Sequence, residues 1–261
     1  MATTRHGDGS AGDANYGRIG GGYAQYRQPE PQIAALIRRA LGDAKTVLNV
    51  GAGAGSYEPR DLAVTAVEPS ASMRAQRPPQ WPAAVDAQAE SLPFADRSFD
   101  AAMATFTVHQ WADLGAGLRE MRRVTRGPVV VMSCAPDELD RFWLQDYAPE
   151  AIEVEARRYP RIDEIAALLG GRVEVQPVPI PLMCSDGFGE AYYGRPERLL
   201  DAGARQACSA WSFVSDEVVQ RFVTTLQRDL DSGVWDRRHG HLRRQPHFEG
   251  SLKLVVAHAE G

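Results

Sequence analysis

The chain has 261 residues, of which 44% are hydrophobic and 24% are charged. These proportions are typical of a folded protein and exclude a chain that is disordered throughout or a collagen-like fibre. The 29 basic and 34 acidic residues give a net charge of −5. This balance argues against a nucleic-acid partner, which needs a basic surface to displace counterions from phosphates.

Cysteine usage and the length of apolar runs bear on where the protein works. Cys134, Cys184 and Cys208 form no CxxC pair, so they predict neither a disulfide framework nor a zinc site. No apolar run approaches the ~20 residues that span a bilayer, and residues 1–15 lack the apolar core of a secretory signal. We therefore expect a cytoplasmic protein with no membrane partner and a flexible tail over residues 1–15.

In the first half of the chain, helical patterns alternate with short apolar runs. Pro31 opens a predicted helix that ends at Gly42, and a second apolar face recurs over residues 114–124. Buried parallel strands are predicted at 46–50, 64–67, 99–106 and 129–133. This alternation predicts an α/β fold with right-handed crossovers.

The pattern changes after Ser133. Residues 135–158 have no clear period, so an irregular segment is expected there. Further elements are predicted in chain order as a helix at 162–169, a strand at 172–178, a helix that begins at Ser215, and a strand at 252–258. The insert before the last strand is too long for a turn. We therefore predict a core of residues 16–180 plus 250–261 and a substrate cap of residues 181–249.

A glycine-rich turn follows the first predicted strand. Gly51, Gly53 and Gly55 allow sharp turns and the close approach of a ligand. A helix expected after them would present N–H groups to an anionic group. Glu68 ends the second predicted strand, where a carboxylate can accept hydrogen bonds from both hydroxyls of a ribose. The pattern indicates a nucleoside site, with a ligand-free tight turn as the alternative.

The register of these glycines is not that of a typical dinucleotide fingerprint. The third position after Gly53 is Ser56, and Tyr57 and Glu58 follow in place of an apolar helix. A nicotinamide cofactor is therefore less favoured, although it stays open.

Several further segments carry a family resemblance. They are residues 47–55, 67–70 with Met73, 89–100, 105–111 and 119–124. In this order and spacing the chain resembles the class I S-adenosylmethionine-dependent methyltransferases, in their ubiquinone/menaquinone-methyltransferase-like branch, over about residues 45–135. The resemblance implies a Rossmann-like, mostly parallel sheet with an antiparallel last strand, in three α/β/α layers, with a helical cap inserted before that strand.

The resemblance also implies S-adenosylmethionine as cofactor and a set of residues that bind it. Glu68 would hold the ribose and Met73 would pack on the adenine. The residues implied to bind the cofactor are Arg27, Asn49, Gly51, Ala52, Gly53, Glu68, Pro69, Met73, Gln88, Ala89, Glu90 and Thr105. Asn49 and Gln88 stand where the family usually has acidic residues, so they can hydrogen-bond without supplying a negative charge.

The sequence gives weaker evidence for the residues that would contact the methyl-accepting substrate. His109 follows the fourth motif and is a candidate general base, with a structural role in the pocket wall as the alternative. Substrate-pocket candidates are Tyr23, Trp143, Tyr192 and Tyr193, with simple packing as the alternative. No metal is expected, because the arginines around His239 and His241 oppose a cation there.

We expect a methyltransferase that acts on the oxygen, nitrogen or carbon of a small molecule. One alternative is a protein of this fold that binds the cofactor but catalyses another reaction or serves as a binding module. The other is an NAD(P)-dependent oxidoreductase.

Overall fold

The computed structural model describes residues 23–259, with side chains from residue 25. The predicted tail over 1–15 and the side chain of Tyr23 lie outside the described residues. The central sheet has six strands in the order β2-β1-β3-β4-β8-β5. Its strands are β1 (Thr46–Val50), β2 (Ala63–Val67), β3 (Ala101–Thr105), β4 (Val129–Cys134), β5 (Val173–Pro177) and β8 (Leu252–Ala257).

Strand direction follows the sequence prediction. β2, β1, β3 and β4 run parallel, and β8 lies antiparallel between β4 and β5. The four parallel strands coincide with the apolar runs, because parallel strands are buried on both faces. The mostly parallel sheet with an antiparallel last strand is therefore confirmed.

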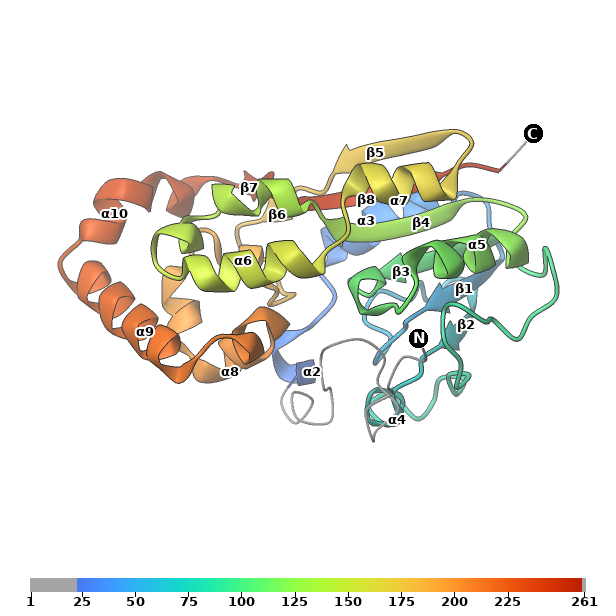
Figure 1. Ribbon diagram of the computed structural model, residues 1–261, viewed down its shortest axis with the longest axis horizontal. Helices are drawn as coiled ribbons and strands as arrows, with labels where there is room; N and C mark the ends of the chain where they lie inside the picture. Colours follow the sequence, from blue (N-terminus) through green and yellow to red (C-terminus); the bar gives the residue numbers. More distant parts are fainter. Residues whose placement is uncertain (1–22, 260–261) are drawn as a thin grey trace.

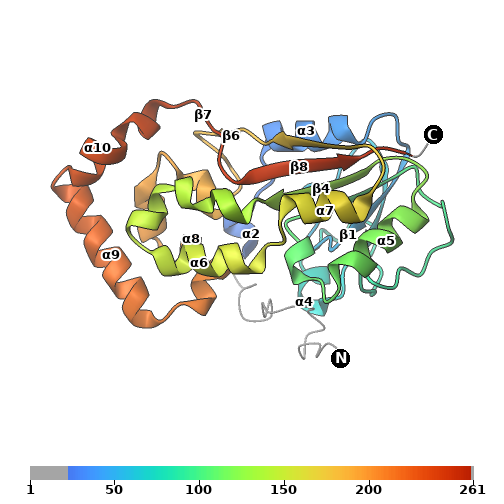
Figure 2. The same cartoon turned by 45° about the horizontal axis from the view of Figure 1, so that its top comes forward.

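Helices cover both faces of this sheet and make the three layers (Figure 2). α3 packs on the face that carries Val47, whereas α5 and α7 pack on the face that carries Leu48. Neighbouring residues of a strand thus pack into two separate cores, because successive side chains of a strand point to opposite faces of the sheet. The helices near the sheet are α3 (Pro31–Ala40), α4 (Ala71–Arg74), α5 (Leu114–Val124), α7 (Ile162–Leu169) and the 3-10 helix η1 (Val108–Gln110). The short helix α2 (Tyr23–Tyr26) instead lies against residues 202–206.

The helix expected after the glycine turn is absent, so that prediction was wrong. Residues 51–62 form successive turns between β1 and β2. Gly51, Gly53 and Gly55 all have positive φ, at 69°, 52° and 90°. Three such residues within five, followed by Pro59, break the chain before a helical turn can form.

A helical lobe extends beyond one end of the sheet (Figure 1). We use this name for residues 136–158 and 180–248. Its elements are η2 (Pro136–Arg141), η3 (Trp143–Asp146), α6 (Pro149–Arg158), β6 (Ile180–Pro181), η4 (Gly189–Tyr192), η5 (Pro196–Leu200), α8 (Ala202–Gln206), η6 (Ser209–Phe213), α9 (Asp216–Asp231), α10 (Val234–His239), η7 (Gly240–Arg244) and β7 (His247–Phe248). The short strands β6 and β7 pair antiparallel and bring the two ends of the second segment together.

The lobe both confirms and corrects the sequence analysis. Ser215 caps α9 and accepts a hydrogen bond from the Val218 N–H, as predicted. The prediction of an irregular segment over 135–158 was wrong in its second half, where α6 forms. Pro149 starts that helix, and Ala151, Ile152 and Val154 are buried. A single-turn apolar face between charged residues is a weak periodic signal, which explains the miss.

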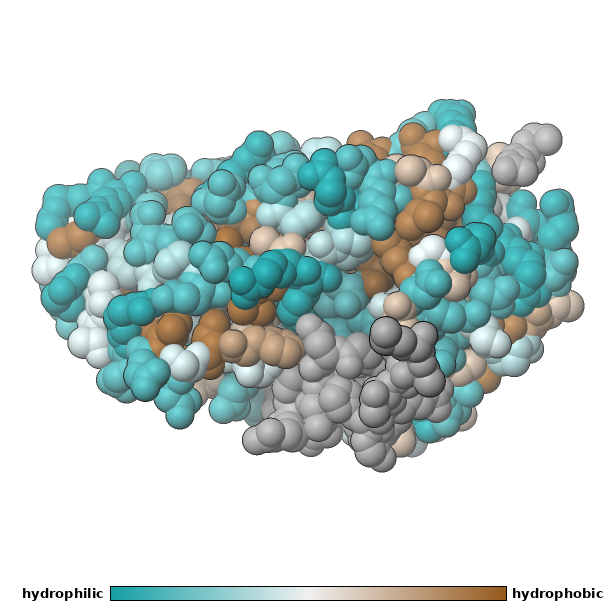
Figure 3. Space-filling view, in the orientation of Figure 1, coloured by the Kyte–Doolittle hydropathy of each residue, from teal (hydrophilic) through white to brown (hydrophobic). Residues whose placement is uncertain are grey.

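The face of the molecule seen in Figure 3 is mainly hydrophilic, with hydrophobic residues in small areas between hydrophilic ones. None of the helices within residues 23–259 combines the length and the hydrophobicity needed to cross a bilayer.

Candidate functional site

A first cavity opens at the carboxyl ends of β1, β2 and β3. Its empty space, mouth included, is about 880 Å³. Of the residues predicted to bind the cofactor, those that line it are Arg27, Gly51, Ala52, Gly53, Glu68, Pro69, Met73, Gln88, Ala89, Glu90 and Thr105. Parallel strands end at one edge of their sheet, so segments far apart in sequence meet there.

Glu68 provides the buried carboxylate of this cavity. Its Oε2 accepts a hydrogen bond from the Gly53 N–H at 2.8 Å, and its Oε1 accepts one from the Ser70 N–H at 2.8 Å. Burial raises the pKa of Glu68, and the two N–H groups partly offset that rise. Each oxygen has a second lone pair, so the carboxylate can still accept two hydroxyl groups.

The first cavity fits the adenosyl group of the implied cofactor. Glu68 offers an acceptor pair suited to a ribose, while Met73 and Ala89 supply buried apolar surface. The glycine turn keeps the floor free of side chains, since a Cβ at Gly53 would already lie 3.2 Å from the Met73 methyl group.

Asn49 lies outside this cavity, against the sequence expectation. Its Nδ2 donates a hydrogen bond to Glu58 Oε1 at 3.1 Å, and both side chains are buried. Glu58 also accepts two hydrogen bonds from Arg77, at 2.8 and 2.9 Å. The amide at this position therefore serves a buried ion pair beneath the glycine turn.

Asn49→Asp should destabilise the protein by about 2 kcal/mol or more at pH 8. The new carboxylate would replace a donor to Glu58 with a like charge in a buried place. One of the two carboxyls must then hold a proton in the folded state, so the loss should shrink as the pH falls towards 5.5. Urea unfolding at both pH values measures this. Asn49→Ala is the control, and an identical pH response in the two variants would contradict the prediction.

Asp186 ties the N-terminal segment to the lobe. The Arg27 Nε donates to its Oδ1 at 2.5 Å, and the Tyr57 hydroxyl donates to its Oδ2 at 2.8 Å. Burial and this carboxylate raise the pKa of Tyr57 well above its usual value, so the phenol stays a donor. The Gly187 N–H also donates to the Tyr26 carbonyl at 2.8 Å. Asp186 thus fixes Arg27 beside the first cavity.

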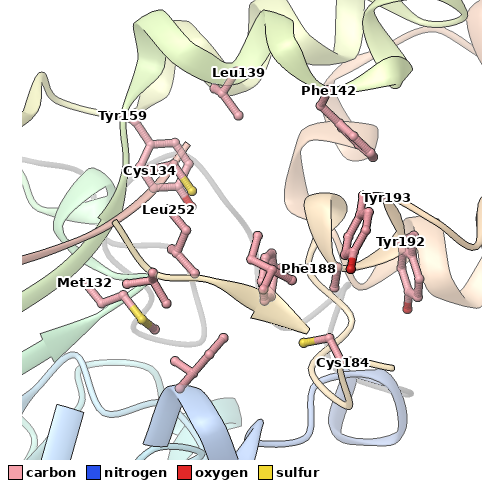
Figure 4. Packing of buried hydrophobic residues seen from close by; sticks show 14 of the residues in the cluster. Met132, Cys134, Leu139, Phe142, Tyr159, Cys184, Phe188, Tyr192, Tyr193 and Leu252 are labelled. Atoms are coloured by element: carbon pink, nitrogen blue, oxygen red, sulfur yellow. The ribbon is translucent and has the colours of Figure 1, made fainter. Parts of the chain in front are cut away.

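A second cavity lies between the sheet end and the helical lobe. Its empty space is about 820 Å³, mouth included. Figure 4 shows Leu139 and Phe142 on the 136–142 segment above Phe188, with Tyr159 and Cys134 at the side. Arg27 and Phe106 line both cavities and form the wall between them.

Phe106 has a left-handed backbone, with φ at 53°. Its N–H donates to the Met132 carbonyl at 3.1 Å, while its ring lies 5.3 Å from the Phe188 ring and 5.1 Å from the Arg27 guanidinium. Positive φ is uncommon for a bulky residue and is found where surrounding contacts enforce it. Here it points the ring into the shared wall.

His109 lines the second cavity. Its ring lies against the ring of Tyr159, tilted by 40°, with ring centroids 4.2 Å apart. Its buried Nδ1 has no hydrogen-bond partner among the described residues. Burial lowers the pKa of His109 well below its usual value, and the charges of Arg158 and Arg27 lower it further. The imidazole is therefore neutral at pH 7.

Because the pKa of His109 is lowered, the wild-type protein should lose stability as the pH falls below about 6.5. The variant His109→Phe has no group to protonate at this position and should not show this loss. The unfolded chain takes up the proton first, so acid favours unfolding, by at most about 1.4 kcal/mol per pH unit. Glu190, with a pKa raised to about 7, gives the opposite slope but is present in both proteins. Urea unfolding at pH 5.5 and 7.5 measures the difference. Parallel pH profiles would refute the prediction.

Three of the aromatic substrate-pocket candidates, Trp143, Tyr192 and Tyr193, lie outside the lining of this cavity. Trp143 is 3% exposed and packs edge-on against Trp235 at 5.7 Å. The Tyr193 hydroxyl donates to the Gln245 carbonyl at 2.7 Å, and its ring stacks on Phe248. Tyr192 borders a separate surface hollow with Tyr26. Packing, the alternative kept for these residues, is the role their surroundings support.

Sequence reasoning missed Tyr57, Phe106 and Asp186. Tyr57 was noted only as a departure from a dinucleotide pattern, and Phe106 was expected to end a strand. Asp186 stands in a stretch interpreted as polar loop, where nothing distinguishes it from other acidic residues. In the part of the chain that the structure describes, no group of His, Cys, Asp and Glu is arranged to hold a metal ion.

Comparison with known proteins places the chain in a family. Residues 48–131 match the model of a methyltransferase domain. A solved structure from Anabaena variabilis, assigned as a methyltransferase of an antibiotic biosynthesis pathway, is 30% identical and has a TM-score of 0.83. The alignment covers 89% of this chain and 99% of that one. The chain belongs to the class I S-adenosylmethionine-dependent methyltransferases.

Curated methyltransferases match over shorter stretches. Malonyl-[acyl-carrier protein] O-methyltransferase of Pseudescherichia vulneris is 35% identical over 143 residues, which is 50% of this chain and 57% of that protein. Demethylmenaquinone methyltransferase of Porphyromonas gingivalis is 34% identical over 113 residues, or 39% of this chain and 44% of that protein. The chain therefore spans about half the length of these curated relatives. The comparisons give no support to the oxidoreductase alternative.

Proposed function

We propose that this protein transfers the methyl group of S-adenosylmethionine, bound in the first cavity, to a small molecule bound in the second. The observation that carries the proposal is the wall that the cavities share. Arg27 and Phe106 line both spaces, so a donor and an acceptor could meet across that wall. The cofactor supplies an electrophilic methyl group on a sulfonium centre.

The residues of the first cavity would bind and orient. Glu68 would accept the ribose hydroxyls, while Met73 and Ala89 would pack against the adenine. Gln88 and Glu90 would line the adenine edge, and Arg27 would face the methionine carboxylate from its place beside Asp186. Holding two reactants in line and excluding water accounts for most of the barrier reduction in such a displacement.

His109 is the candidate base of the second cavity. Its neutral imidazole can accept a hydrogen bond or a proton from an acceptor hydroxyl or amine. Residues 181–249 would act as the substrate cap, since Phe188, Glu190 and Trp211 from this stretch line the cavity. Because α6 lines it as well, the cap that we propose includes residues 136–158.

The acceptor is proposed to be a small molecule because the second cavity is partly enclosed and mainly apolar. The curated relatives are named for malonyl-[acyl-carrier protein] and demethylmenaquinone, so their names do not agree on one acceptor. The net charge of −5 supports the absence of a nucleic-acid partner. Three free cysteines, of which Cys134 and Cys184 are buried, support the cytoplasmic location that we propose.

Calorimetric titration with S-adenosylmethionine, S-adenosylhomocysteine and NADH tests the cofactor part of this proposal. Both adenosyl ligands should bind, and NADH should give no signal. Methyl transfer to a screened acceptor then separates an enzyme from a cofactor-binding module. Binding of NADH alone would refute the proposal.

A further inference from the structure

The second cavity has apolar walls that come from both segments of the helical lobe. Leu139, Phe142 and Ile152 come from the first segment, and Phe188 and Trp211 come from the second. The residues that line it surround a space between the end of the sheet and the lobe. A molecule that fills it therefore exchanges water mainly for aliphatic and aromatic surface.

Among the described residues, Arg27 lines the cavity and Arg158 lies just outside it, and each of them lies against a carboxylate. Of the described residues that line the cavity, Arg27 carries the positive charge, and buried Asp186 binds that guanidinium at 2.5 Å. Just outside, Arg158 Nη1 donates to Ser209 Oγ at 2.8 Å and lies 3.7 Å from Glu155 Oε2. Each of these two arginines therefore already has a carboxylate partner in the protein, with which an anionic ligand would have to compete.

Carboxyl groups are present in the lining itself. Glu155 from α6 and Glu190 from η4 both border the cavity. Glu190 is 4% exposed and accepts hydrogen bonds from the N–H and hydroxyl of Ser251, at 2.9 and 2.7 Å. An anionic ligand would meet these groups after losing its own hydration, which is unfavourable without a cation to pair with.

A neutral polar group would find a partner in His109. Its Nδ1 is buried in the cavity wall without a partner among the described residues. A buried nitrogen of this kind gains a hydrogen bond when a ligand supplies the missing donor or acceptor. The position beside Tyr159 also gives an aromatic ligand a ring surface to pack on.

Resting on the proposed methyl transfer, we infer that the acceptor is an uncharged, mainly apolar molecule with a hydroxyl or amine group, and that carboxylate acceptors are rejected. The cavity selects by an apolar wall, a hydrogen-bonding imidazole and two carboxyl groups. Glu155 is the specificity residue, because its pairing with Arg158 keeps that cation from an anionic ligand.

Three probes with one ring skeleton test this inference. Protein saturated with S-adenosylhomocysteine is titrated at pH 7.5 with 1-naphthol, 1-naphthylamine and 1-naphthoate. The first two should bind at least tenfold more tightly than 1-naphthoate. Equal or tighter binding of 1-naphthoate would overturn the inference, and so would failure of all three probes to bind. If S-adenosylhomocysteine itself does not bind, the proposed function fails instead.

Matched variants test whether the probes bind in the second cavity and whether Glu155 weakens the binding of 1-naphthoate. Glu155→Gln should tighten 1-naphthoate binding at least fivefold and leave 1-naphthol unchanged, whereas Glu153→Gln, on the same helix but exposed, should change neither. Ala210→Phe should weaken 1-naphthol binding at least tenfold by filling the cavity, with S-adenosylhomocysteine affinity unaltered as the check on folding. Unchanged probe binding in both Glu155→Gln and Ala210→Phe would show that the probes bind elsewhere and would overturn the inference.

Discussion

Glu68→Ala should weaken the binding of S-adenosylhomocysteine at least a hundredfold. If Glu68 holds the ribose as we propose, the variant loses two hydrogen bonds from ribose hydroxyls to a charged acceptor, worth about 3–6 kcal/mol together. The Glu68 carboxylate also accepts hydrogen bonds from the Gly53 and Ser70 N–H groups and so helps to shape the glycine turn, and the variant lacks this acceptor as well. Calorimetric titration measures the loss. Asp61→Ala, which removes an exposed carboxylate paired with Arg38, is the control and should leave affinity unchanged.

A ligand analogue separates ribose binding from the shaping of the turn. Wild-type protein should bind S-adenosylhomocysteine much more tightly than its 2′-deoxy analogue, and Glu68→Ala should bind the two almost equally. If a folded Glu68→Ala variant keeps the full preference for the ribose form, another residue must hold the ribose, and its assignment to Glu68 fails.

Asp186→Ala should lower the free energy of unfolding by about 3–5 kcal/mol. The carboxylate is 1% exposed and serves both the Arg27 guanidinium and the Tyr57 hydroxyl. Its removal leaves a buried positive charge and a buried phenol without this acceptor. Urea unfolding, followed by tryptophan fluorescence, measures the change.

The matched control for Asp186 is Glu153→Ala. Glu153 forms an exposed pair with Arg157, with the closest charged atoms 3.9 Å apart, so its loss should change stability by less than about 1 kcal/mol. Equal effects of Glu153→Ala and Asp186→Ala would contradict the role given to Asp186. Arg27→Met with Asp186→Leu should restore part of the stability, because no buried charge is then left behind.

The sheet could be predicted because its strands carry their own signal. Runs such as Val47 to Val50 and Val129 to Met132 are continuous and apolar, and glycines or prolines end them. The first cavity followed from the sheet, since Glu68 and the glycine turn come directly after strands whose carboxyl ends must lie side by side.

The second cavity could not be predicted in the same way. Its wall residues come from short helices and 3-10 turns, whose positions depend on tertiary packing more than on local periodicity. Trp143 and Tyr193 are of residue types that often line ligand pockets, yet they are buried in the core of the lobe. Asn49 shows a further limit, because only its three-dimensional neighbour Glu58 explains why an amide stands there.

The pairing of β6 with β7 has a consequence for how such enzymes diversify. Ile180 pairs with Phe248, so the longer segment of the lobe leaves the core and returns to it through neighbouring strands. If recombination replaced residues 182–246, the two ends of the new segment would join β6 and β7, which the rest of the protein already holds side by side. The first cavity is formed mostly by residues 51–111, so replacement of residues 182–246 would leave its lining almost unchanged. The incoming segment would still pack beside the resident α6, which also lines the second cavity and would limit the ligands that this cavity could take up.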